Sequence, residues 1–246
     1  MNAATWVLVD DVETARDARG QMDADTAMLD AVRAGGPPML RVYRWATPTL
    51  SLGRFQPEAD VEGSACRHWG VDVVRRPTGG RAVLHGADVT YAVAMRIPDG
   101  PTGRVDALYR HVAGGVIAAL ARLGVTAEVA CHRGPTDPVC FASQRGADLR
   151  VGDRKVCGSA QVRRDGAVLQ HGSVLVDRLA FDETDLVAGL TPPARAAAKG
   201  RLRAATVTLG ELGVEADPRA VAAALVSGFA ATLDVKFQVM EPAAGG

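Results

Sequence analysis

The sequence predicts an α+β protein in which amphipathic helices flank a mixed, largely antiparallel central sheet. Three observations lead to this prediction. Long segments with apolar residues at helical spacing are mixed with short strand-like segments. An Asp165-Gly166 pair joins two strand candidates directly, as in an antiparallel hairpin. Strands and helices do not follow the regular alternation that builds a parallel sheet.

The composition argues against several classes of protein. The chain has 246 residues, 48% of them hydrophobic, which suits one domain over residues 1–246 with a sizeable core. Its 28 Lys and Arg balance 28 Asp and Glu, and 4% of residues are aromatic, which disfavours a protein that coats nucleic acid or anionic membrane. The sequence shows no secretory signal, no membrane-spanning apolar run and no disulfide framework among its four cysteines. We therefore expect a cytoplasmic protein that binds neither nucleic acid nor membranes.

The first helix is expected over residues 12–33, because Met22, Leu29 and Val32 recur on one face. Asp25 falls on the same face. We interpret it as a carboxylate at the edge of the apolar stripe that pairs with an arginine, in preference to a buried acid that orders nearby loops.

Strand-like segments follow over residues 40–45, 50–53 and 71–75, and a glycine-rich turn comes after them at residues 78–80. Apolar residues then alternate with period two, which predicts a half-buried strand; they are Val89, Tyr91, Val93 and Met95. A second amphipathic helix is expected over residues 105–123, with a stripe made of Leu108, Val112, Val116, Leu120 and Leu123.

The second half of the chain begins with an irregular stretch over residues 131–147. Three short strands are then expected over residues 148–151, 155–163 and 167–176, with tight turns between them. Asp217 suits the N-cap of a third helix and Pro218 its first turn. The stripe of this helix is Val221, Leu225, Phe229 and Leu233, and a last strand follows with Val235, Phe237 and Val239 alternating.

The first patch with chemical potential is RRPTGGRAVLH, residues 75–85. Two arginines end a strand, and two glycines let the backbone turn tightly and approach a phosphate, a carbonyl or an acyl chain. The segment is no P-loop, because no Gly-Lys-Ser/Thr follows, and two adjacent glycines do not make a dinucleotide fingerprint. Turn chemistry alone favours a plain hairpin connection here.

Two neighbouring strands carry the next patches. In KVCGSAQ, residues 155–161, the side chains of Lys155, Cys157, Ser159 and Gln161 are expected on one face, and small or apolar ones on the other. QHGS, residues 170–173, pairs with this strand across the hairpin. Glycine within a strand often marks the close approach of a ligand. We therefore interpret the two strands as a pocket wall in preference to an ordinary surface hairpin.

Cys140 lies in the irregular stretch, where functional residues concentrate. A cysteine is most often a small buried core residue. Lys155 begins a strand shortly afterwards, however, and a nearby ammonium lowers the pKa of a thiol and favours the nucleophilic thiolate. The cysteines and histidines show no CxxC or HxxxH spacing, so no metal site is expected, and the Gly-x-Ser-x-Gly elbow of serine hydrolases is absent.

Four strings, in this order, resemble the biotin/lipoate protein ligase catalytic-domain family. They are QMDADTAMLDA (21–31), LRVYRWATPTLSLGRFQ (40–56), RRPTGGRAVLHGADVTYAV (75–93) and RKVCGSAQVRRDGAVLQHGSVLVD (154–177). Together they span nearly all of residues 21–177, so they are far more specific than a lone glycine turn. The family includes biotin ligases, lipoate–protein ligases and octanoyltransferases. The resemblance implies the class II synthetase/biotin-ligase-like form of the predicted fold.

Within the family, the sequence is most similar to the LipM-type octanoyltransferases. Lipoate ligases usually carry three glycines after the arginines, whereas the third position here is Arg81. The Cys140-Phe141 pair matches the Cys-Phe pair that this subgroup has before its lysine strand. The resemblance therefore implies Cys140 as the acyl-thioester nucleophile and Lys155 as the partner that lowers its pKa.

The implied reaction is a two-step transfer without ATP and without a cofactor. The Cys140 thiolate takes the octanoyl group from octanoyl-acyl carrier protein. A lysine of a lipoyl domain or of the glycine-cleavage H protein then takes it as an amide. Backbone N–H groups near the glycine-rich segments are candidates to stabilise the oxyanion.

The resemblance and the patches together assign substrate-binding residues. For the acyl slot, Val83, Ala160 and Leu175 are the candidates. The full set of expected binding residues is Arg76, Thr78, Gly79, Gly80, Ala82, Val83, His85, Gly158, Ser159, Ala160, Gln161, His171, Gly172 and Ser173.

Alternative functions remain open at this point. An ATP-dependent lipoate–protein ligase would use the glycine-rich segment for an adenylate phosphate, and Arg81 and Cys140-Phe141 argue against it. An amidotransferase between two lipoyl domains would use the same cysteine chemistry. A non-catalytic subunit that docks lipoyl domains is disfavoured because Lys155 and a candidate nucleophile are both present. Cys157, expected on the same strand face as Lys155, is a competing nucleophile ranked below Cys140.

Overall fold

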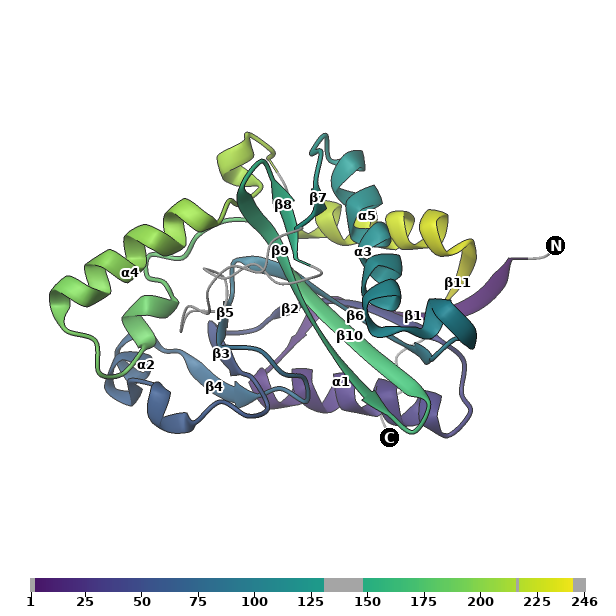
Figure 1. The fold of residues 1–246 in the computed structure, drawn as a ribbon, viewed down its shortest axis with the longest axis horizontal. Coiled ribbons are helices and arrows are strands. Elements are labelled where there is room, and N and C mark those ends of the chain that lie inside the picture. The colour runs from purple at the N-terminus through teal and green to yellow at the C-terminus, as the bar shows by residue number, and fades with distance from the viewer. Residues whose placement is uncertain (1–2, 131–147, 216, 241–246) are drawn as a thin grey trace.

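A mixed sheet forms the centre of the protein (Figure 1). The computed structural model describes residues 3–130, 148–215 and 217–240. Within them, β1 pairs in parallel with β2 and β11, and the other neighbouring strands pair antiparallel. The predicted α+β class with a mixed, largely antiparallel sheet is confirmed. The strand order is β11 (Val235–Val239), β1 (Ala4–Arg16), β2 (Met39–Trp45), β6 (Asp88–Arg96), β10 (Ala167–Leu175), β9 (Arg154–Arg164), β8 (Leu149–Val151) and β7 (Glu128–Val129).

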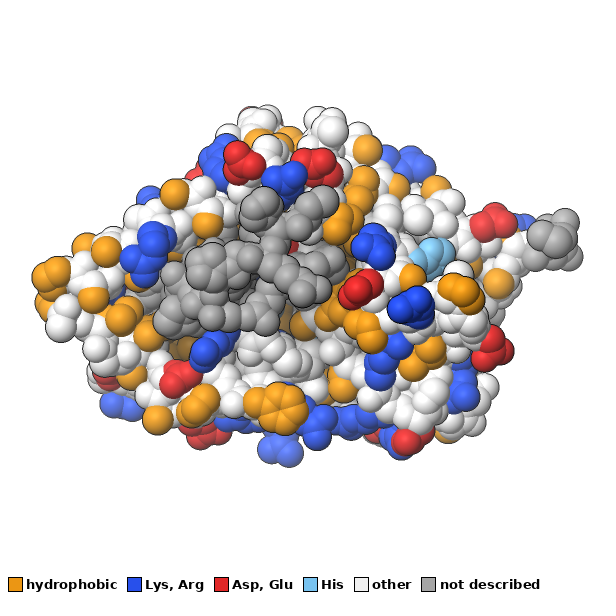
Figure 2. Space-filling model, in the orientation of Figure 1, with side chains coloured by type: hydrophobic (Ala, Val, Ile, Leu, Met, Phe, Trp, Pro, Cys, Tyr) orange, Lys and Arg blue, Asp and Glu red, His pale blue; other side chains and the backbone are white. Residues whose placement is uncertain are grey.

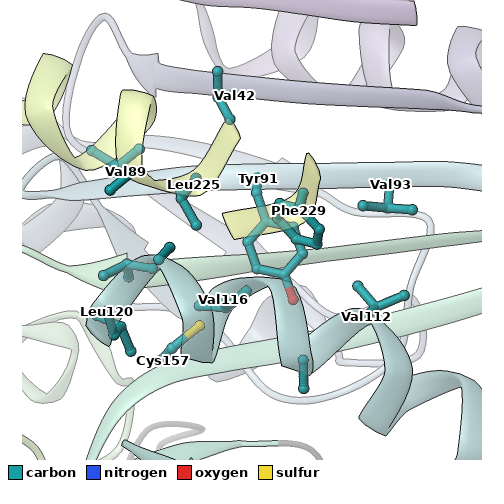
Figure 3. Close-up of a cluster of buried hydrophobic side chains, with 14 of the residues drawn as sticks. Val42, Val89, Tyr91, Val93, Val112, Val116, Leu120, Cys157, Leu225 and Phe229 are labelled. Carbon is teal, nitrogen blue, oxygen red and sulfur yellow. The ribbon is translucent and has the colours of Figure 1, made fainter. Parts of the chain in front are cut away.

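Helices cover both faces of this sheet. Helix α1 (Ala18–Arg33) lies on one face, and α3 (Val105–Arg122) and α5 (Pro218–Leu233) lie together on the other (Figure 1). The alternating large residues of β6 pack against α3 and α5, where Tyr91 and Val93 lie close to Phe229 and Val112 (Figure 3). Ala92 of the same strand packs towards α1. The prediction of a half-buried strand is therefore wrong, because β6 is buried on both faces.

A smaller sheet stands beside the first, in the order β4 (Asp72–Arg75), β3 (Thr49–Leu52) and β5 (Val83–His85). β3 runs parallel to β4 and antiparallel to β5. Residues 76–82 therefore cross from one edge of this sheet to the other, over the end of β3. The hairpin interpretation of the glycine-rich segment is wrong, because β4 and β5 do not pair with each other.

The glycines at this crossing permit a close approach of two backbones. A Cβ atom on Gly53 would lie 1.9 Å from the carbonyl oxygen of Gly80, and Gly80 itself has a φ of 97°. The N–H of Arg54 donates to the carbonyl of Thr78 over 2.8 Å. A side chain at Gly53 would displace the segment from β3, and one at Gly80 would be strained by the positive φ.

The predicted first helix starts too early. Residues 12–16 belong to β1, and Asp17 caps α1 by accepting a hydrogen bond from the N–H of Gly20. Val12 lies off the stripe of Met22, Leu29 and Val32, and pairing of β1 with its neighbouring strands keeps residues 12–16 extended. Five further elements were not predicted from the sequence: β1, β5, β7, α2 (Gly63–Trp69) and α4 (Pro192–Ala205). The sequence of α4 shows little apolar periodicity, because Ala198 and Leu202 are the two residues of this helix that are buried.

The predicted hairpin turn and the predicted start of the last helix are confirmed. The turn between β9 and β10 has positive φ at Asp165 and Gly166, as its sequence predicts. Asp217 caps α5, and Pro218 is in its first turn.

No helix in the described part of the chain is long and apolar enough to cross a bilayer. Short 3₁₀ helices occur at Glu58–Asp60, Gly100–Gly103, Glu183–Leu186 and Gly210–Leu212.

Candidate active site

A cavity of about 790 Å³ opens where the β9–β10 hairpin faces the small sheet and its glycine-rich crossing. This volume lies within the range of roughly 300–1,000 Å³ typical of small-molecule sites. Positive, negative and apolar side chains are interspersed over much of the face shown in Figure 2. The structure brings most of the expected site residues to the cavity wall: Arg76, Gly79, Gly80, Val83, His85, Lys155, Gly158, Ser159, Ala160, Gln161, His171, Gly172 and Ser173.

Other expected site residues lie elsewhere. Thr78 is fully buried beneath the wall, and Ala82 packs into the core of the small sheet. Leu175, a candidate for the acyl slot, packs against Leu202 of α4 outside this cavity. Cys140 lies outside the described residues.

Part of the cavity wall was not predicted. Most of these residues lie within the strings at 21–31, 40–56 and 75–93, where no individual site role had been assigned to them. Pro57, Asp60, Tyr109 of α3 and Asp148 before β8 lie outside those strings. Tyr43 and Trp45 lie two apart on β2, a spacing that puts both on one strand face and is the available signal. The missed wall residues are Met22, Tyr43, Trp45, Ser51, Phe55, Gln56, Pro57, Asp60, Arg81, Thr90, Tyr109 and Asp148.

Lys155 forms a buried ion pair in the cavity wall. Its Nζ lies 2.9 Å from Oδ2 of Asp148, and the two residues are 2% and 4% exposed. The N–H of Ser159 also donates to Oδ1 of Asp148 over 3.4 Å. A buried carboxylate at this distance stabilises the ammonium form of the lysine and sets its position.

A β-bulge turns Lys155 towards the cavity. Leu149 of β8 lies opposite Cys157, whereas the next residue, Arg150, lies opposite Lys155. One step along β8 thus corresponds to two residues along β9. Residues two apart on a strand normally share a face, but the extra residue at this bulge places Lys155 and Cys157 on opposite faces of the sheet. The prediction that Lys155 shares a face with Cys157, Ser159 and Gln161 is therefore wrong.

Cys157 is not placed to compete as a nucleophile. It is fully buried in the core beneath α3, close to Val116 and Leu120 (Figure 3). Burial, followed by the nearby charge of Asp148, raises the pKa of its thiol to about 12. The thiolate is the reactive form of cysteine, so this thiol is inert near neutral pH.

Asp25 anchors one buried polar network, which we name the His171 array: Asp25, His171 and Thr78. Oδ2 of Asp25 lies 2.8 Å from His171 Nδ1, and His171 Nε2 lies 2.7 Å from the Thr78 hydroxyl. Arg41 donates to Oδ1 of Asp25 over 2.9 Å, and the Tyr43 hydroxyl donates to Oδ2 over 3.0 Å. Asp25 does pair with an arginine, but it is fully buried and ties helix α1 to β10 and the glycine-rich segment. The placement of Asp25 at the edge of the stripe is wrong.

Replacing Asp25 with asparagine is expected to destabilise the protein by about 3 kcal/mol, near the lower end for breaking a buried ion pair, because Arg41 keeps Asp11 as a partner. Burial raises the pKa of Asp25, but His171, Arg41 and Tyr43 together bring it below its usual value. The carboxylate therefore contributes stability above about pH 4, and that contribution is lost as the pH falls through its folded-state pKa.

Urea unfolding between pH 3 and 7 measures both effects. The variant should lose stability at pH 7 and lose less than the wild type on acidification. Asp23→Asn is the matched control on the same helix, where an exposed pair with Arg19 predicts a change within about 0.5 kcal/mol. Equal stability of wild type and Asp25→Asn at pH 7 would contradict the network assignment.

A second buried network, which we name the His85 array, contains Asp88, His85 and Ser51. Oδ2 of Asp88 lies 2.8 Å from His85 Nδ1, and His85 Nε2 lies 2.8 Å from Ser51 Oγ. The indole of Trp45 stacks on the imidazole with ring centroids 4.2 Å apart. The ring is therefore held on both edges and one face.

Arg76 holds the glycine-rich segment in place. Its guanidinium donates to the carbonyls of Ser51 and Arg81, each over 2.6 Å, and to that of Gly79 over 2.9 Å. These bonds fix the shape of the crossing that forms one side of the cavity. In the described part of the chain, no group of three or more His, Cys, Asp or Glu residues is arranged to hold a metal ion.

Comparisons with known proteins agree on one family. The lipoyl protein ligase A/B catalytic domain matches residues 17–230. The octanoyltransferase LipM of Symbiobacterium thermophilum is 38% identical over 243 residues, which cover 93% of this chain and 86% of that protein. LipM of Carboxydothermus hydrogenoformans is 40% identical over 177 residues, which cover 70% of this chain and 65% of that protein.

A solved structure shows the same fold. It is the bi-partite lipoate protein ligase of Thermoplasma acidophilum studied with its E2 lipoyl domain, and it superposes with a TM-score of 0.77. The two chains are 24% identical, and the superposition covers 98% of this chain and 88% of the other.

Proposed function

This chain belongs to the lipoyl protein ligase A/B catalytic-domain family, and we propose that within it the protein is an octanoyltransferase of lipoate biosynthesis. It moves an octanoyl group from octanoyl-acyl carrier protein to a lysine of a lipoyl-accepting protein, through a thioester on Cys140. The observation that carries the proposal is the buried Lys155 in the wall of a cavity of small-molecule size, in a chain whose relatives are named octanoyltransferase LipM.

The first step is the attack of the Cys140 thiolate on the thioester carbonyl carbon. The new carbon–sulfur bond forms, and the carrier thiolate leaves. Lys155 assists as a fixed positive charge, because an ammonium near a thiol stabilises the thiolate. Asp148 positions this ammonium over 2.9 Å. A thioester is already activated, so the step consumes no ATP.

The second step transfers the octanoyl group to the acceptor. The ε-amine of a lysine attacks the carbonyl of the octanoyl-cysteine, a carbon–nitrogen bond forms, and the Cys140 sulfur leaves. Lipoyl domains are the acceptors we propose, in keeping with the ligase of the same fold that was studied with its E2 lipoyl domain. The glycine-cleavage H protein is a second acceptor of the same kind.

The cavity suits a medium-length acyl chain. Its wall includes the apolar side chains of Met22, Trp45 and Val83 and the small residues Gly158 and Ala160. Each buried CH₂ group contributes about 0.8 kcal/mol of transfer free energy, so an eight-carbon tail contributes several kcal/mol at most. The cavity thus provides affinity for the acyl group itself.

Octanoyl transfer without ATP is the test of this proposal. Purified protein is mixed with octanoyl-acyl carrier protein and an apo lipoyl domain, and the intact mass of the lipoyl domain is followed. A mass gain of one octanoyl group without ATP, stable to hydroxylamine because the product is an amide, is the expected result.

Two other outcomes would contradict the proposal. A gain that requires free acid and ATP would establish an ATP-dependent lipoate–protein ligase. A gain only when the donor is an octanoylated lipoyl domain would establish an amidotransferase.

A further inference from the structure

The His85 array ends in the wall of the cavity. His85 and Ser51 both line the cavity, whereas Asp88 lies behind them in β6. His85 is 6% exposed and Ser51 is 1% exposed, so both are largely buried in the wall and reach solvent through the cavity. An imidazole held between a carboxylate and a hydroxyl is an arrangement that moves a proton between the hydroxyl and the ring.

The partners of the array determine where its hydrogens lie. The Asp88 carboxylate can only accept a hydrogen bond, so Nδ1 of His85 donates to it. Arg76 Nη1 lies 3.3 Å from Ser51 Oγ and can only donate. Ser51 Oγ lies 2.8 Å from Nε2 of His85 and 3.5 Å from the carbonyl oxygen of Val83, the two acceptors within its reach in the described part of the chain. Nε2, whose lone pair faces the hydroxyl when Nδ1 donates to Asp88, is the nearer of the two.

The proposed amide-forming step needs a proton acceptor. A lysine side chain is an ammonium at neutral pH, and only its free amine attacks a thioester. Lys155 is not suited to accept this proton, since its ion pair with Asp148 favours the charged form. Tyr109 also lines the cavity, but burial raises the pKa of its hydroxyl to about 12, so the phenolate is not available.

The two histidine arrays differ at the hydroxyl end. Thr78, which ends the His171 array, is fully buried and does not line the cavity. Ser51, which ends the His85 array, does line it. Of these two arrays, the His85 array is the one that presents its hydroxyl to a substrate.

We infer that Ser51 and His85 accept the proton that the acceptor lysine loses before it attacks the octanoyl-thioester, with Asp88 as the positioning residue. The inference rests on the proposed function. The ammonium gives one proton to Ser51 Oγ as the Ser51 hydrogen moves to His85 Nε2. The neutral nitrogen then attacks the carbonyl carbon, the carbon–sulfur bond breaks, and the second proton passes from nitrogen to the leaving sulfur. His85 afterwards releases its proton to solvent.

Four elements surround the imidazole of His85. Asp88 from β6 lies on the Nδ1 side, Ser51 from β3 lies on the Nε2 side, and Arg76 lies across Ser51. Ser173 from β10 contributes a hydroxyl 3.2 Å from Nδ1, and Trp45 from β2 contributes an uncharged ring. Among the described residues in direct contact with the imidazole, Asp88 is the charged one.

The test compares two nucleophiles on the isolated octanoyl-enzyme. The enzyme is loaded from octanoyl-acyl carrier protein as wild type, His85→Gln and Ser51→Ala, and its discharge is followed by rapid quench from pH 6 to 9. One nucleophile is the apo lipoyl domain. The other is hydroxylamine, which is uncharged at neutral pH and needs no proton acceptor before it attacks.

We expect both variants to discharge to the lipoyl domain about 100-fold more slowly at pH 7, the lower end of general-base effects, and to recover as the pH rises. Discharge to hydroxylamine should fall far less. Ser51→Thr, which keeps a hydroxyl, should restore transfer to the lipoyl domain. Thermal unfolding of each variant shows whether it is folded. If His85→Gln does not fold, Ser51→Ala still tests the inference, because it keeps the imidazole.

Two results would overturn the inference alone. Equal slowing with both nucleophiles would mean that the array only shapes the cavity. An unchanged rate with the lipoyl domain would mean that another group takes the proton. A wild type that forms no octanoyl-enzyme would instead contradict the proposed function, and the inference with it.

Discussion

Replacing Cys140 with alanine should abolish the octanoyl adduct on the enzyme and lower transfer to the lipoyl domain by a factor on the order of 10⁴ or more, because the covalent route then has no nucleophile. The measurement is intact-protein mass spectrometry after mixing with octanoyl-acyl carrier protein. In the wild type we expect one adduct that hydroxylamine removes, as it removes a thioester. Peptide mapping should place it on the segment that contains Cys140.

Two cysteines serve as matched controls for this prediction. Cys131→Ala removes a thiol from the same segment of the sequence, and Cys157→Ala removes the fully buried one, whose raised pKa makes it unreactive. Both variants should keep the adduct. An adduct that persists in Cys140→Ala and disappears in Cys131→Ala would show that Cys131 carries the thioester. It would contradict the assignment of Cys140 as the nucleophile.

Replacing Lys155 with methionine should slow formation of the octanoyl-enzyme at least roughly 100-fold at pH 7. Without the Lys155 ammonium, the pKa of the Cys140 thiol should move towards the unperturbed value of about 8.5, and the fraction of thiolate should fall. Alkylation of the enzyme by iodoacetamide as a function of pH measures this directly. The midpoint for the Cys140 peptide should shift to higher pH.

Controls separate this chemical effect from a loss of folding. Lys155→Met leaves Asp148 as a buried carboxylate without its lysine, which costs about 3–5 kcal/mol by the rule for broken buried pairs. The double variant Lys155→Met, Asp148→Asn removes that charge and should regain stability without regaining activity. Lys236→Met, on exposed β11, is the matched lysine control and should behave as wild type. An unchanged alkylation midpoint in Lys155→Met would contradict the assigned role.

Several parts of the fold could be predicted because their signals are local. The Asp165-Gly166 turn and the Asp217 cap depend on the conformations that a few adjacent residues tolerate. Prediction failed where distant partners set the structure. The helix start at residue 12 was wrong, because pairing of β1 with distant strands keeps residues 12–16 extended.

The candidate site was predictable to the extent that its residues lie in recognisable strings. Arg76, Lys155 and His171 all line the cavity, as their strings implied. Ser51 lies in one of these strings but in an apolar strand, and Asp148 is a lone aspartate outside them, so no polar pattern marked either residue. Their importance comes from what stands opposite them in space.

By itself, the sequence determined the α+β class, the hairpin that forms the cavity wall and the family of the chain, since each depends on residue order over short spans. Only the tertiary structure decided that β6 is buried on both faces, that Asp25 is the buried centre of a network and that Lys155 and Cys157 point in opposite directions. The physical reason is that burial, ion pairing and strand register are set by partners far away in the chain. A one-residue shift between β8 and β9 places Lys155 beside Asp148 in the cavity and leaves Cys157 in the core.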